Sequence, residues 1–542
     1  MSLPGSATGV VVRTVPLGGG SLSRAIQAGA APAAWQLAWP RDRAAWTARA
    51  ESVRATHDGA WLDALTEAFG SVDSPALARR RSAATRGVVV TTGQQPGLFG
   101  GPAYTITKAL SALALADALE AALGIPVAPI FWAATDDADW REASVTHIVG
   151  EHGLVTLSQD GPPTDGIAMR DVPLGDVRRQ LALLQASCGS VVAPEVLEQL
   201  AAAYAGECTV GGAYVQWLRA VLEPLGISVL DAAHPSTRRA LDSGLRMALQ
   251  SAARVDSALR ARTAAISADG FTPQVELVDG LSLVFATIDG VRTRVPLADA
   301  VHMAASQPVG ALGANVLLRP VLERQLLPTV AYVAGPGELA YFAQATAVAD
   351  AMDVPLPLGV PRWAADWIEP QVARQLERLG VSDEELHDPH ALETRVARGA
   401  MDRDVLDSLE RLRMTLDAQV GALGHAVAQA DALVAPTVME GVARDIGHRI
   451  DRLERRLVAA VKRREQALAR DVAVVRAARR PLGSAPERVL SLVPVLARHG
   501  LAVLDQFRDE AAHHARALVH GSTHQASVAS DERAATERAT SA

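Results

Sequence analysis

The sequence has 542 residues, of which 21% are charged and 49% are hydrophobic, so the chain can bury a large core and is not disordered as a whole. At roughly 100–200 residues per domain, this length accommodates about three domains. The net charge of −8 argues against a general nucleic-acid-binding protein, which needs a positive field. The two cysteines, Cys188 and Cys208, exclude a disulfide-stapled secreted scaffold and favour a reducing compartment.

Targeting and membrane signals are not found in the sequence. The N-terminal residues contain no apolar stretch of the length of a signal peptide. The most apolar region, residues 109–134, is interrupted by two acidic residues and two prolines, unlike a membrane span. We therefore expect a cytoplasmic protein with no membrane and no nucleic-acid partner.

The first part of the chain predicts a helical segment followed by an α/β core. Residues 1–87 are rich in alanine, arginine and tryptophan, which indicates a mostly helical segment joined to the core. Residues 88–92 then form a β-branched run, followed by a glycine-rich turn, a helix to about Leu123 and a second apolar run over 127–133. This order predicts a βαβ unit and hence a parallel sheet of the Rossmann type.

The core is expected to span residues 88–368 with inserted segments. Apolar runs at 227–230 and 329–333 predict two further strands. Between them, residues 275–295 alternate like antiparallel strands, and Asp289–Gly290 is a hairpin signal.

After Pro370 the pattern becomes helical. Apolar residues three or four apart over 405–427 and 442–461 predict an antiparallel coiled-coil hairpin within residues 369–480. Its second arm, 444–480, holds 12 Lys or Arg against 5 Asp or Glu; a solvated face explains such a run, and an anionic ligand is the alternative. Residues 481–520 are expected to pack back on the core, and residues 521–542 to be disordered.

The segment from Val88 to Leu110 is the strongest candidate for a binding site. Its glycines at 93, 97, 100 and 101 let the backbone turn tightly and approach a ligand closely. The helix that starts near Pro102 presents unpaired amides and a partial positive charge, which suit an anion. The spacing matches neither the dinucleotide fingerprint nor the phosphate loop, and a plain tight turn remains the alternative.

Lysine is rare in this chain, because Lys108 and Lys462 are the only two among 52 lysines and arginines. A lysine in a chain that otherwise uses arginine suggests a position where a guanidinium group cannot replace the smaller ammonium group. Chance is the other interpretation. At 100° per residue, Lys108 shares one helix face with Tyr104. We expect this face to look toward a cleft or the next domain while the opposite, apolar face packs on the sheet.

An acidic cluster follows the second predicted strand. Asp136, Asp137 and Asp139 lie just beyond its carboxyl end, where open α/β sheets place ligands. Three carboxylates this close could raise a pKa, bind an ammonium group or hold a magnesium ion, and a solvated acidic loop is the alternative. Glu142 and His147 could join the same rim.

A third cluster lies around the last predicted strand of the core. Asn315 and Arg319 are four residues apart, so both would face one way on a helix, and an arginine there could grip a carboxylate. Gly335 begins a second strand-to-helix turn, in which Glu338 is either a site residue or only a helix-start residue. Arg362 is another candidate anion contact.

These segments together resemble the BshC family of cysteine ligases, the cysteine-adding enzymes of bacillithiol biosynthesis. The resemblance spans roughly residues 88–521 and is carried by TTGQQPGLFGGPAYTITKA, by the block 131–139, by NVLLRP with LLPTVAYVAGPGELAYFAQ, by Pro361–Arg362 and by PLGSAPERVLSLVPVLARHG. It implies a Rossmann-like core with insertions, homodimerisation through a coiled coil, and a reaction that joins the carboxyl of cysteine to the amine of glucosaminyl-malate.

Two positions depart from the family pattern. The family block EDHD reads Asp136–Asp139 here, with Ala138 in place of its histidine. The histidine often seen near Val275 is also missing, and Glu276 stands there. Both differences weaken a histidine-based mechanism, unless His147 substitutes, and favour carboxylates and Lys108.

The expected catalytic residues are Lys108, Asp137, Asp139 and His147. The expected substrate-binding residues are Gly93, Gln94, Gln95, Tyr104, Asn315, Arg319, Gly335, Glu338 and Arg362. ATP or another nucleotide with magnesium is expected to activate the carboxyl, with nucleotide contacts from Gly100, Gly101 and Lys462, and no dedicated protein metal site is assigned.

Two rival functions remain open from the sequence. One is a different nucleotide-dependent, amide-forming or group-transfer enzyme on the same core. The other is a non-catalytic coiled-coil protein whose core senses a ligand. The replacement of the family histidine by Ala138 is the reason for considering it. An assay with cysteine, glucosaminyl-malate and ATP separates these possibilities.

Overall fold

The computed structural model describes residues 9–70, 73–161, 165–430 and 434–521. The chain divides into two units. The first comprises the chain up to Ile148, residues 156–367 and the chain from Glu487 onward, and the second comprises residues 149–155 and 368–486. Within the ranges described, no helix combines the length and apolar character needed to cross a bilayer.

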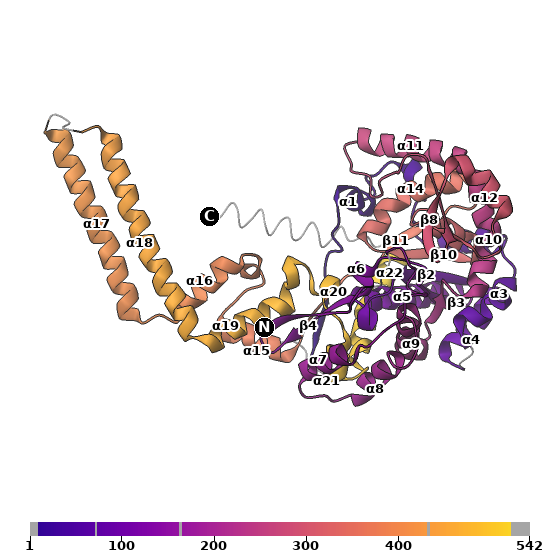
Figure 1. Cartoon of the computed structure of the whole chain (residues 1–542), viewed down its shortest axis with the longest axis horizontal. Coiled ribbons are helices and arrows are strands. Elements are labelled where there is room, and N and C mark those ends of the chain that lie inside the picture. The colour runs from indigo at the N-terminus through magenta and orange to yellow at the C-terminus, as the bar shows by residue number, and fades with distance from the viewer. Residues whose placement is uncertain (1–8, 71–72, 162–164, 431–433, 522–542) are drawn as a thin grey trace. The chain divides into compact units, whose positions relative to one another are not determined.

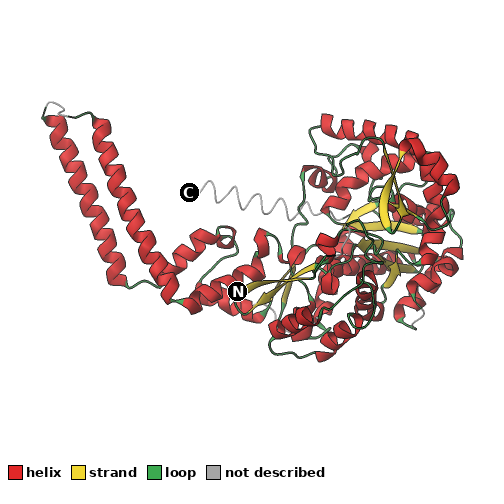
Figure 2. Ribbon diagram, viewed as in Figure 1, coloured by secondary structure: helices red, strands yellow, loops and turns green. Residues whose placement is uncertain are grey.

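The first unit is built on a five-stranded sheet in which every neighbouring pair is parallel (Figure 2). The strand order is β11-β10-β2-β3-β6. The strands are β2 (Val88–Gln94), β3 (Val127–Ala133), β6 (Ser228–Asp231), β10 (Thr329–Ala334) and β11 (Gly359–Pro361). The predicted βαβ unit and the Rossmann-like parallel core are therefore confirmed.

Helices cover the central strands, so their side chains are buried on both faces. All seven residues of β3 are buried, as are the first six of β2. This burial explains why these strands appear in the sequence as continuous apolar runs rather than as alternating ones. The crossover helix α5 (Tyr104–Leu123) and the helix α14 (Pro336–Met352) are buried around most of their circumference, as expected for helices enclosed by other elements.

The remaining helices of the first unit lie along the chain before, between and after these strands (Figure 1). They are α1 (Ser21–Gln27), α2 (Arg43–Arg54), α3 (Ala60–Phe69), α4 (Pro75–Arg86), α6 (Trp140–Ala143), α7 (Arg178–Cys188), α8 (Pro194–Ala203), α9 (Val210–Leu222), α10 (Pro235–Gln250), α11 (Ala252–Ala268), α12 (Ala300–Ser306), α13 (Arg319–Leu326), α20 (Pro486–Val489), α21 (Val493–His499) and α22 (Val503–His520).

Smaller sheets accompany the main one. β7 (Leu281–Ile288) and β8 (Val291–Pro296) form the predicted antiparallel hairpin, and β9 (Leu312–Ala314) pairs with β7. The prediction that strand structure begins at Val275 is wrong: this stretch is a loop, and the buried Gln344 side chain bonds both the amide and the carbonyl of Val275. Two strand pairs were not predicted, β1 (Val11–Thr14) with β12 (Ala365–Ile368), and β4 (Val145–Gly150) with β5 (Gly153–Ser158).

The C-terminal segment of the first unit packs on its core. α22 contacts α5 along its length, and the buried Phe507 lies against the rings of Trp363 and Trp367. These contacts place residues 486–520 beside the same helix that carries Lys108. The predicted disordered tail, residues 521–542, lies outside the described residues except for Gly521.

Apart from residues 149–155, the second unit is mainly helical. It contains α15 (Pro370–Leu379), α16 (Pro389–Gly399), α17 (Arg403–Gln429), α18 (Pro436–Arg464) and α19 (Gln466–Arg479). The long helices α17 and α18 contact each other side by side (Figure 1), with Arg413 of α17 paired to Asp451 and Glu454 of α18. The predicted coiled-coil hairpin is therefore confirmed.

Candidate functional site

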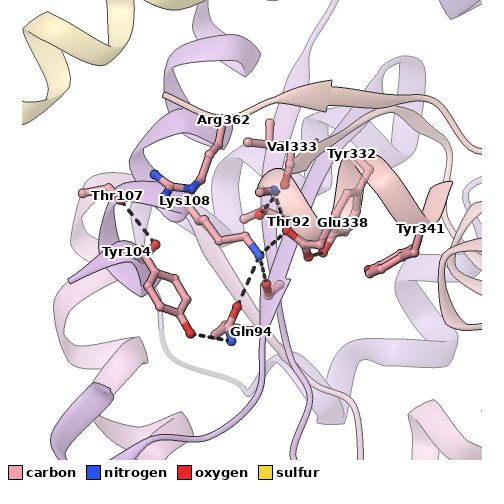
Figure 3. A network of polar contacts seen from close by, with 12 residues as sticks. Thr92, Gln94, Tyr104, Thr107, Lys108, Tyr332, Val333, Glu338, Tyr341 and Arg362 are labelled. Carbon is pink, nitrogen blue, oxygen red and sulfur yellow. Dashed lines mark hydrogen bonds and ion pairs between the residues drawn. The ribbon is translucent and has the colours of Figure 1, made fainter. Parts of the chain in front are cut away.

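The candidate site lies where β2, β3 and β10 end, at the edge of the sheet where open α/β folds bind ligands. Figure 3 shows that Lys108, Glu338 and Arg362, which are far apart in the sequence, lie close together there. The expectation that the face of α5 carrying Lys108 looks toward an open cleft is wrong, because Lys108 is 2% exposed and faces other polar groups inside the protein. The groups it meets are largely buried.

Lys108 forms an internal ion pair. Its ammonium nitrogen Nζ lies 2.7 Å from Glu338 Oε2 and also donates to the carbonyl of Gly93 at 2.6 Å and to Gln94 Oε1 at 3.3 Å. An ammonium has three protons, so these contacts use all of them. The residue is 2% exposed; burial lowers the pKa of Lys108, and the charge of Glu338 opposes that shift.

Glu338 serves the helix start and the ion pair at once. From the first turn of α14 its Oε2 accepts the amide of Gly335 at 2.6 Å, and its Oε1 accepts the Tyr332 hydroxyl at 2.6 Å. Burial alone would raise the pKa of Glu338, but the Lys108 ammonium outweighs it and holds the pKa below the usual value. The helix-start role raised from the sequence for Glu338 is therefore confirmed, and its carboxylate is also the partner of Lys108.

Arg319 extends the network from Glu338 to the cavity described below. Its guanidinium donates to the hydroxyls of Tyr332 at 3.1 Å and Tyr341 at 3.0 Å, and to Glu323 at 2.9 Å. Burial raises the pKa of Glu323 to about 7, against the pull of Arg319. Asn315 differs from expectation: it precedes α13, and its Oδ1 accepts the amides of residues 317 and 318, so it positions the helix that carries Arg319.

Arg362 is engaged by a carboxylate of the protein itself. Its guanidinium binds Glu487 of α20 through two bonds, at 2.9 and 2.5 Å, and donates to the carbonyl of Trp363 at 2.8 Å. Both Arg362 and Glu487 are 3% exposed. The sequence indicated an anion contact for Arg362; the contact in the structure is intramolecular.

A second polar cluster surrounds Glu142. The Tyr104 hydroxyl donates to its Oε1 at 2.8 Å, and the side-chain amides of Gln94 and Gln95 also donate to the carboxylate. Burial raises the pKa of Glu142, while the Tyr104 bond opposes the shift. Because the Gln94 carbonyl oxygen accepts from Lys108, Gln94 joins this cluster to the Lys108–Glu338 pair.

The acidic loop after β3 is ordered mainly by its own amides. Asp137 accepts the amide of Ala138 at 2.6 Å, and Asp139 accepts the amide of Glu142 at 3.2 Å as the N-cap of α6. Burial and the nearby charge of Asp136 raise the pKa of Asp137. Among the described residues, no three His, Cys, Asp or Glu side chains are grouped as metal ligands.

His147 lies on β4, where its Nδ1 is 3.0 Å from the hydroxyl of Thr156. Its backbone carbonyl accepts the amide of Ser491 at 2.9 Å. Partial burial lowers the pKa of His147. These contacts fit a residue that joins β4 to the C-terminal segment, and they do not connect His147 to the Lys108 network.

The bend after β2 is filled by its own residues and by aromatic side chains. The Gly100 amide donates to the Gly97 carbonyl and faces the Tyr204 hydroxyl at 3.3 Å, and the Gly101 amide donates to the Leu98 carbonyl. A Cβ on Gly100 would lie 2.6 Å from the Trp217 indole nitrogen. The geometry therefore does not fit the expected nucleotide contacts at Gly100 and Gly101. Lys462 belongs to α18, and its side chain lies outside the described residues.

The nearest cavity opens beside the acidic loop instead. It is lined by Asp136 and by four guanidinium groups, together with apolar side chains. The four arginines are Arg170, Arg238, Arg292 and Arg319. Arg170 pairs with the exposed Asp171, and Arg292 stacks on Phe285 at 4.5 Å. The volume, about 40 Å³, holds only a water-sized group, so a larger ligand requires the long arginine side chains to rearrange.

Three of these arginines were not anticipated from the sequence. Arg170, Arg238 and Arg292 belong to a loop, to α10 and to β8, and no local motif marks them. In a chain where arginine replaces nearly every lysine, a single arginine carries little information. Only the fold brings them to one cavity.

Comparison with known proteins gives two family matches. Residues 80–363 match the family described as "Bacillithiol biosynthesis BshC, N-terminal Rossmann-like domain". Residues 365–517 match "Bacillithiol biosynthesis BshC, C-terminal coiled-coil domain". The second match covers the helical unit and the segment that returns to the core.

Several curated proteins are similar over most of the chain. A protein of Solibacter usitatus is 30% identical over 447 residues, covering 79% of this chain and 83% of the relative. One of Koribacter versatilis is 28% identical over 495 residues, covering 88% and 92%. One of Salinibacter ruber is 27% identical over 453 residues, covering 78% and 80%. Each is named "Putative cysteine ligase BshC".

Proposed function

Since this chain belongs to the BshC family, we propose that it is a ligase that joins the carboxyl of cysteine to the amine of glucosaminyl-malate in bacillithiol biosynthesis. The product contains a new carbon–nitrogen bond. Its formation requires the amine to lose a proton and the cysteine carboxyl to lose an activated oxygen. The expected reaction thus needs a site for a dicarboxylate, a site for an ammonium group and a proton acceptor.

The observation that carries this proposal is the cavity lined by four arginines. Four guanidinium groups against the single carboxylate of Asp136 make a positive site that suits two carboxylates, and arginine binds carboxylates in a bidentate manner. The malate part of glucosaminyl-malate supplies two carboxylates on adjacent carbons. Arg238 is the strongest candidate contact, because within the described part of the chain no hydrogen bond or ion pair is recorded for its guanidinium.

Asp137, which follows the lining residue Asp136 in the chain, and Glu142 of α6 are assigned the remaining functions. Asp137 and Glu142 each have a pKa raised by burial, which suits a group that accepts a proton near neutral pH. We assign the amine of the substrate to the side of the cavity formed by Asp136 and Asp137. The Lys108–Glu338 pair stands behind this rim and fixes Gln94, which in turn orients Glu142.

Activation of the cysteine carboxyl is proposed to use ATP or another nucleotide with magnesium. The bend at Gly100 and Gly101 does not fit phosphates, since its amides are already bonded, and no grouped protein ligands for magnesium occur within the described ranges. Magnesium commonly binds through substrate phosphates with one or two carboxylates.

The test is to incubate purified protein with cysteine and glucosaminyl-malate, with and without ATP and magnesium, and to follow the condensed thiol by mass spectrometry. The expected result is a product whose mass equals the two substrates minus one water. Replacing glucosaminyl-malate by glucosamine, which lacks the dicarboxylate, should abolish turnover. Equal use of both acceptors would contradict the role of the arginine-lined cavity, and binding without any product would favour the ligand-sensing alternative.

We also propose that the protein is a cytoplasmic homodimer held together by α17 and α18. The support is a set of apolar side chains left exposed on these helices, including Met414 at 66%, Leu423 at 55% and Val438 at 50%. Exposed apolar surface of this kind marks interaction sites. The molar mass measured by light scattering should be twice that of the chain, and Leu423→Glu should lower it to that of a monomer.

A further inference from the structure

We propose that Glu487 is a positioning residue whose negative charge offsets, at the Lys108 ammonium, the repulsion exerted by the neighbouring Arg362 guanidinium. Lys108 is thereby kept charged and seated between Gly93, Gln94 and Glu338. The effect of Glu487 on Lys108 stands without any assumption about substrates. Only its consequence for catalysis rests on the proposed function.

The Glu487 carboxylate is held in position by several hydrogen-bond donors. Besides the two bonds from Arg362, its Oε2 accepts the amide of Ala365 at 3.0 Å and the hydroxyl of Thr107 at 3.4 Å. Thr107 directly precedes Lys108 on α5. The carboxylate therefore bridges α20, the segment after β11 and the helix of the site lysine, and a buried carboxylate with this many donors is held in one orientation.

Arg362 lies beside the Lys108–Glu338 pair. Figure 3 shows the Arg362 side chain next to Lys108. A Cβ on Gly335, whose amide binds Glu338, would lie 3.8 Å from Arg362 Nε. Two cationic side chains this close inside the protein repel each other, because buried charges are poorly screened.

Charged groups of both signs surround the Lys108 ammonium. Glu338 of α14 attracts its ammonium, whereas Arg362 and Arg319 repel it; the tyrosines at 104 and 332 are neutral neighbours. Each of these three cations is paired with its own carboxylate, Lys108 with Glu338, Arg319 with Glu323 and Arg362 with Glu487. Loss of the Glu487 charge leaves one cation uncompensated next to Lys108, which favours the neutral amine.

The small number of lysines makes the test direct. In protein labelled with 13C at lysine Cε, the NMR signal that disappears in Lys462→Arg belongs to Lys462, and the remaining one reports Lys108. The pH titration of that signal is measured in full-length protein. We expect Glu487→Gln to shift the midpoint of the Lys108 titration to lower pH by about one unit or more, equivalent to ~1.4 kcal/mol per unit.

A matched control and a second variant pair keep the test decisive. Glu223→Gln also removes a buried carboxylate near an arginine, Arg219 at 3.8 Å, but at the amino end of β6, away from the site; it should leave the Lys108 midpoint unchanged. If Glu487→Gln does not fold, Arg362→Met is compared with Arg362→Met/Glu487→Gln. The double variant should titrate at lower pH than the single one, because only the single variant keeps the negative charge.

The role of Glu487 and the proposed ligase function can each fail while the other holds. An unchanged Lys108 midpoint in folded Glu487→Gln, or identical midpoints in the second pair of variants, overturns the role of Glu487. A shifted midpoint supports it even in protein that forms no ligation product. Where turnover is measurable, the alkaline limb of kcat should move down in pH with the Lys108 midpoint, whereas a merely structural role of Glu487 would lower the yield of folded protein without moving that limb.

Discussion

Two glycine-containing turns connect a strand of the sheet to the helix that follows it, and they are used differently. After β2, the amides of Gly100 and Gly101 bond within the bend, and Tyr204 and Trp217 pack against it. After β10, the Gly335 amide binds Glu338, whose carboxylate also receives Lys108 and Tyr332. The turn that appears more like an anion site in the sequence is a packing element, and the shorter turn organises the charged network. The difference lies in what each turn meets in the fold.

The largest effect expected for the second turn comes from Lys108→Met. Removing the ammonium leaves Glu338 buried without its cation, which costs about 3–5 kcal/mol of unfolding free energy, and turnover should be lost. Urea denaturation followed by circular dichroism measures the loss, and Lys108→Met/Glu338→Gln should recover most of the stability but not the activity.

For the first turn, Gly100→Ala tests whether the bend is a packing element. The residue has a φ of +89°, and the added methyl would collide with Trp217, so a loss of about 1–3 kcal/mol in stability is expected from overpacking and backbone strain. The KM for glucosaminyl-malate of the folded fraction should stay within a factor of two or so of the parent value. A large rise in KM with unchanged stability would instead place a ligand at the bend.

The arginine-lined cavity is tested by Arg238→Ala. Loss of a carboxylate contact should raise the KM for glucosaminyl-malate about 10- to 100-fold, which corresponds to roughly 1.4–2.8 kcal/mol, with little change in stability. Arg239→Ala is the matched control, because the adjacent arginine is exposed and forms only a distant ion pair with Glu67. Equal effects of the two substitutions would mean that the cavity acts only through general charge.

The pH dependence of turnover tests Glu142. Burial raises its pKa, so the carboxylate form needed to accept a proton disappears as pH falls through a value above the ordinary one for glutamate. We expect the acid limb of kcat to reflect this raised pKa and Glu142→Gln to reduce kcat about 10²-fold while removing the limb. Glu120→Gln, a change at a half-exposed position of α5, should keep both; an acid limb that persists in Glu142→Gln assigns it to another group.

The smallest effect is expected for Tyr341→Phe. The change removes one of the two tyrosine hydroxyls that hold Arg319 and leaves Tyr332 in place. Loss of one such hydrogen bond corresponds to about 0.5–1.5 kcal/mol, or a few-fold rise in the KM for glucosaminyl-malate. A KM identical to that of the parent protein would show that Arg319 is positioned by Tyr332 and Glu323 alone.

The parallel core could be predicted from the sequence because it leaves a local signal, a strand–turn–helix–strand pattern, and Lys108 could be singled out because it is one of two lysines in an arginine-rich chain. The acidic loop after β3 was found for the same reason. The cavity could not be predicted, since Arg170, Arg238 and Arg292 come from three separate elements and resemble every other arginine in the chain. Asn315 and Arg362 were singled out from the sequence as candidate substrate contacts. In the structure Asn315 binds the nearby amides of residues 317 and 318, and the partner of Arg362, Glu487, is brought to it only by the tertiary fold.

The late position of Glu487 in the chain has a consequence for the order in which parts of the protein can fold during synthesis. The chain leaves the first unit after Trp367 and returns to it at Glu487, so the ribosome must translate more than a hundred further residues before the Arg362 guanidinium can meet its carboxylate. During that interval the Rossmann-like part lacks both the partner of Arg362 and the packing of α22 on α5. We expect the nascent part to remain accessible to proteases and chaperones until the last helix has emerged.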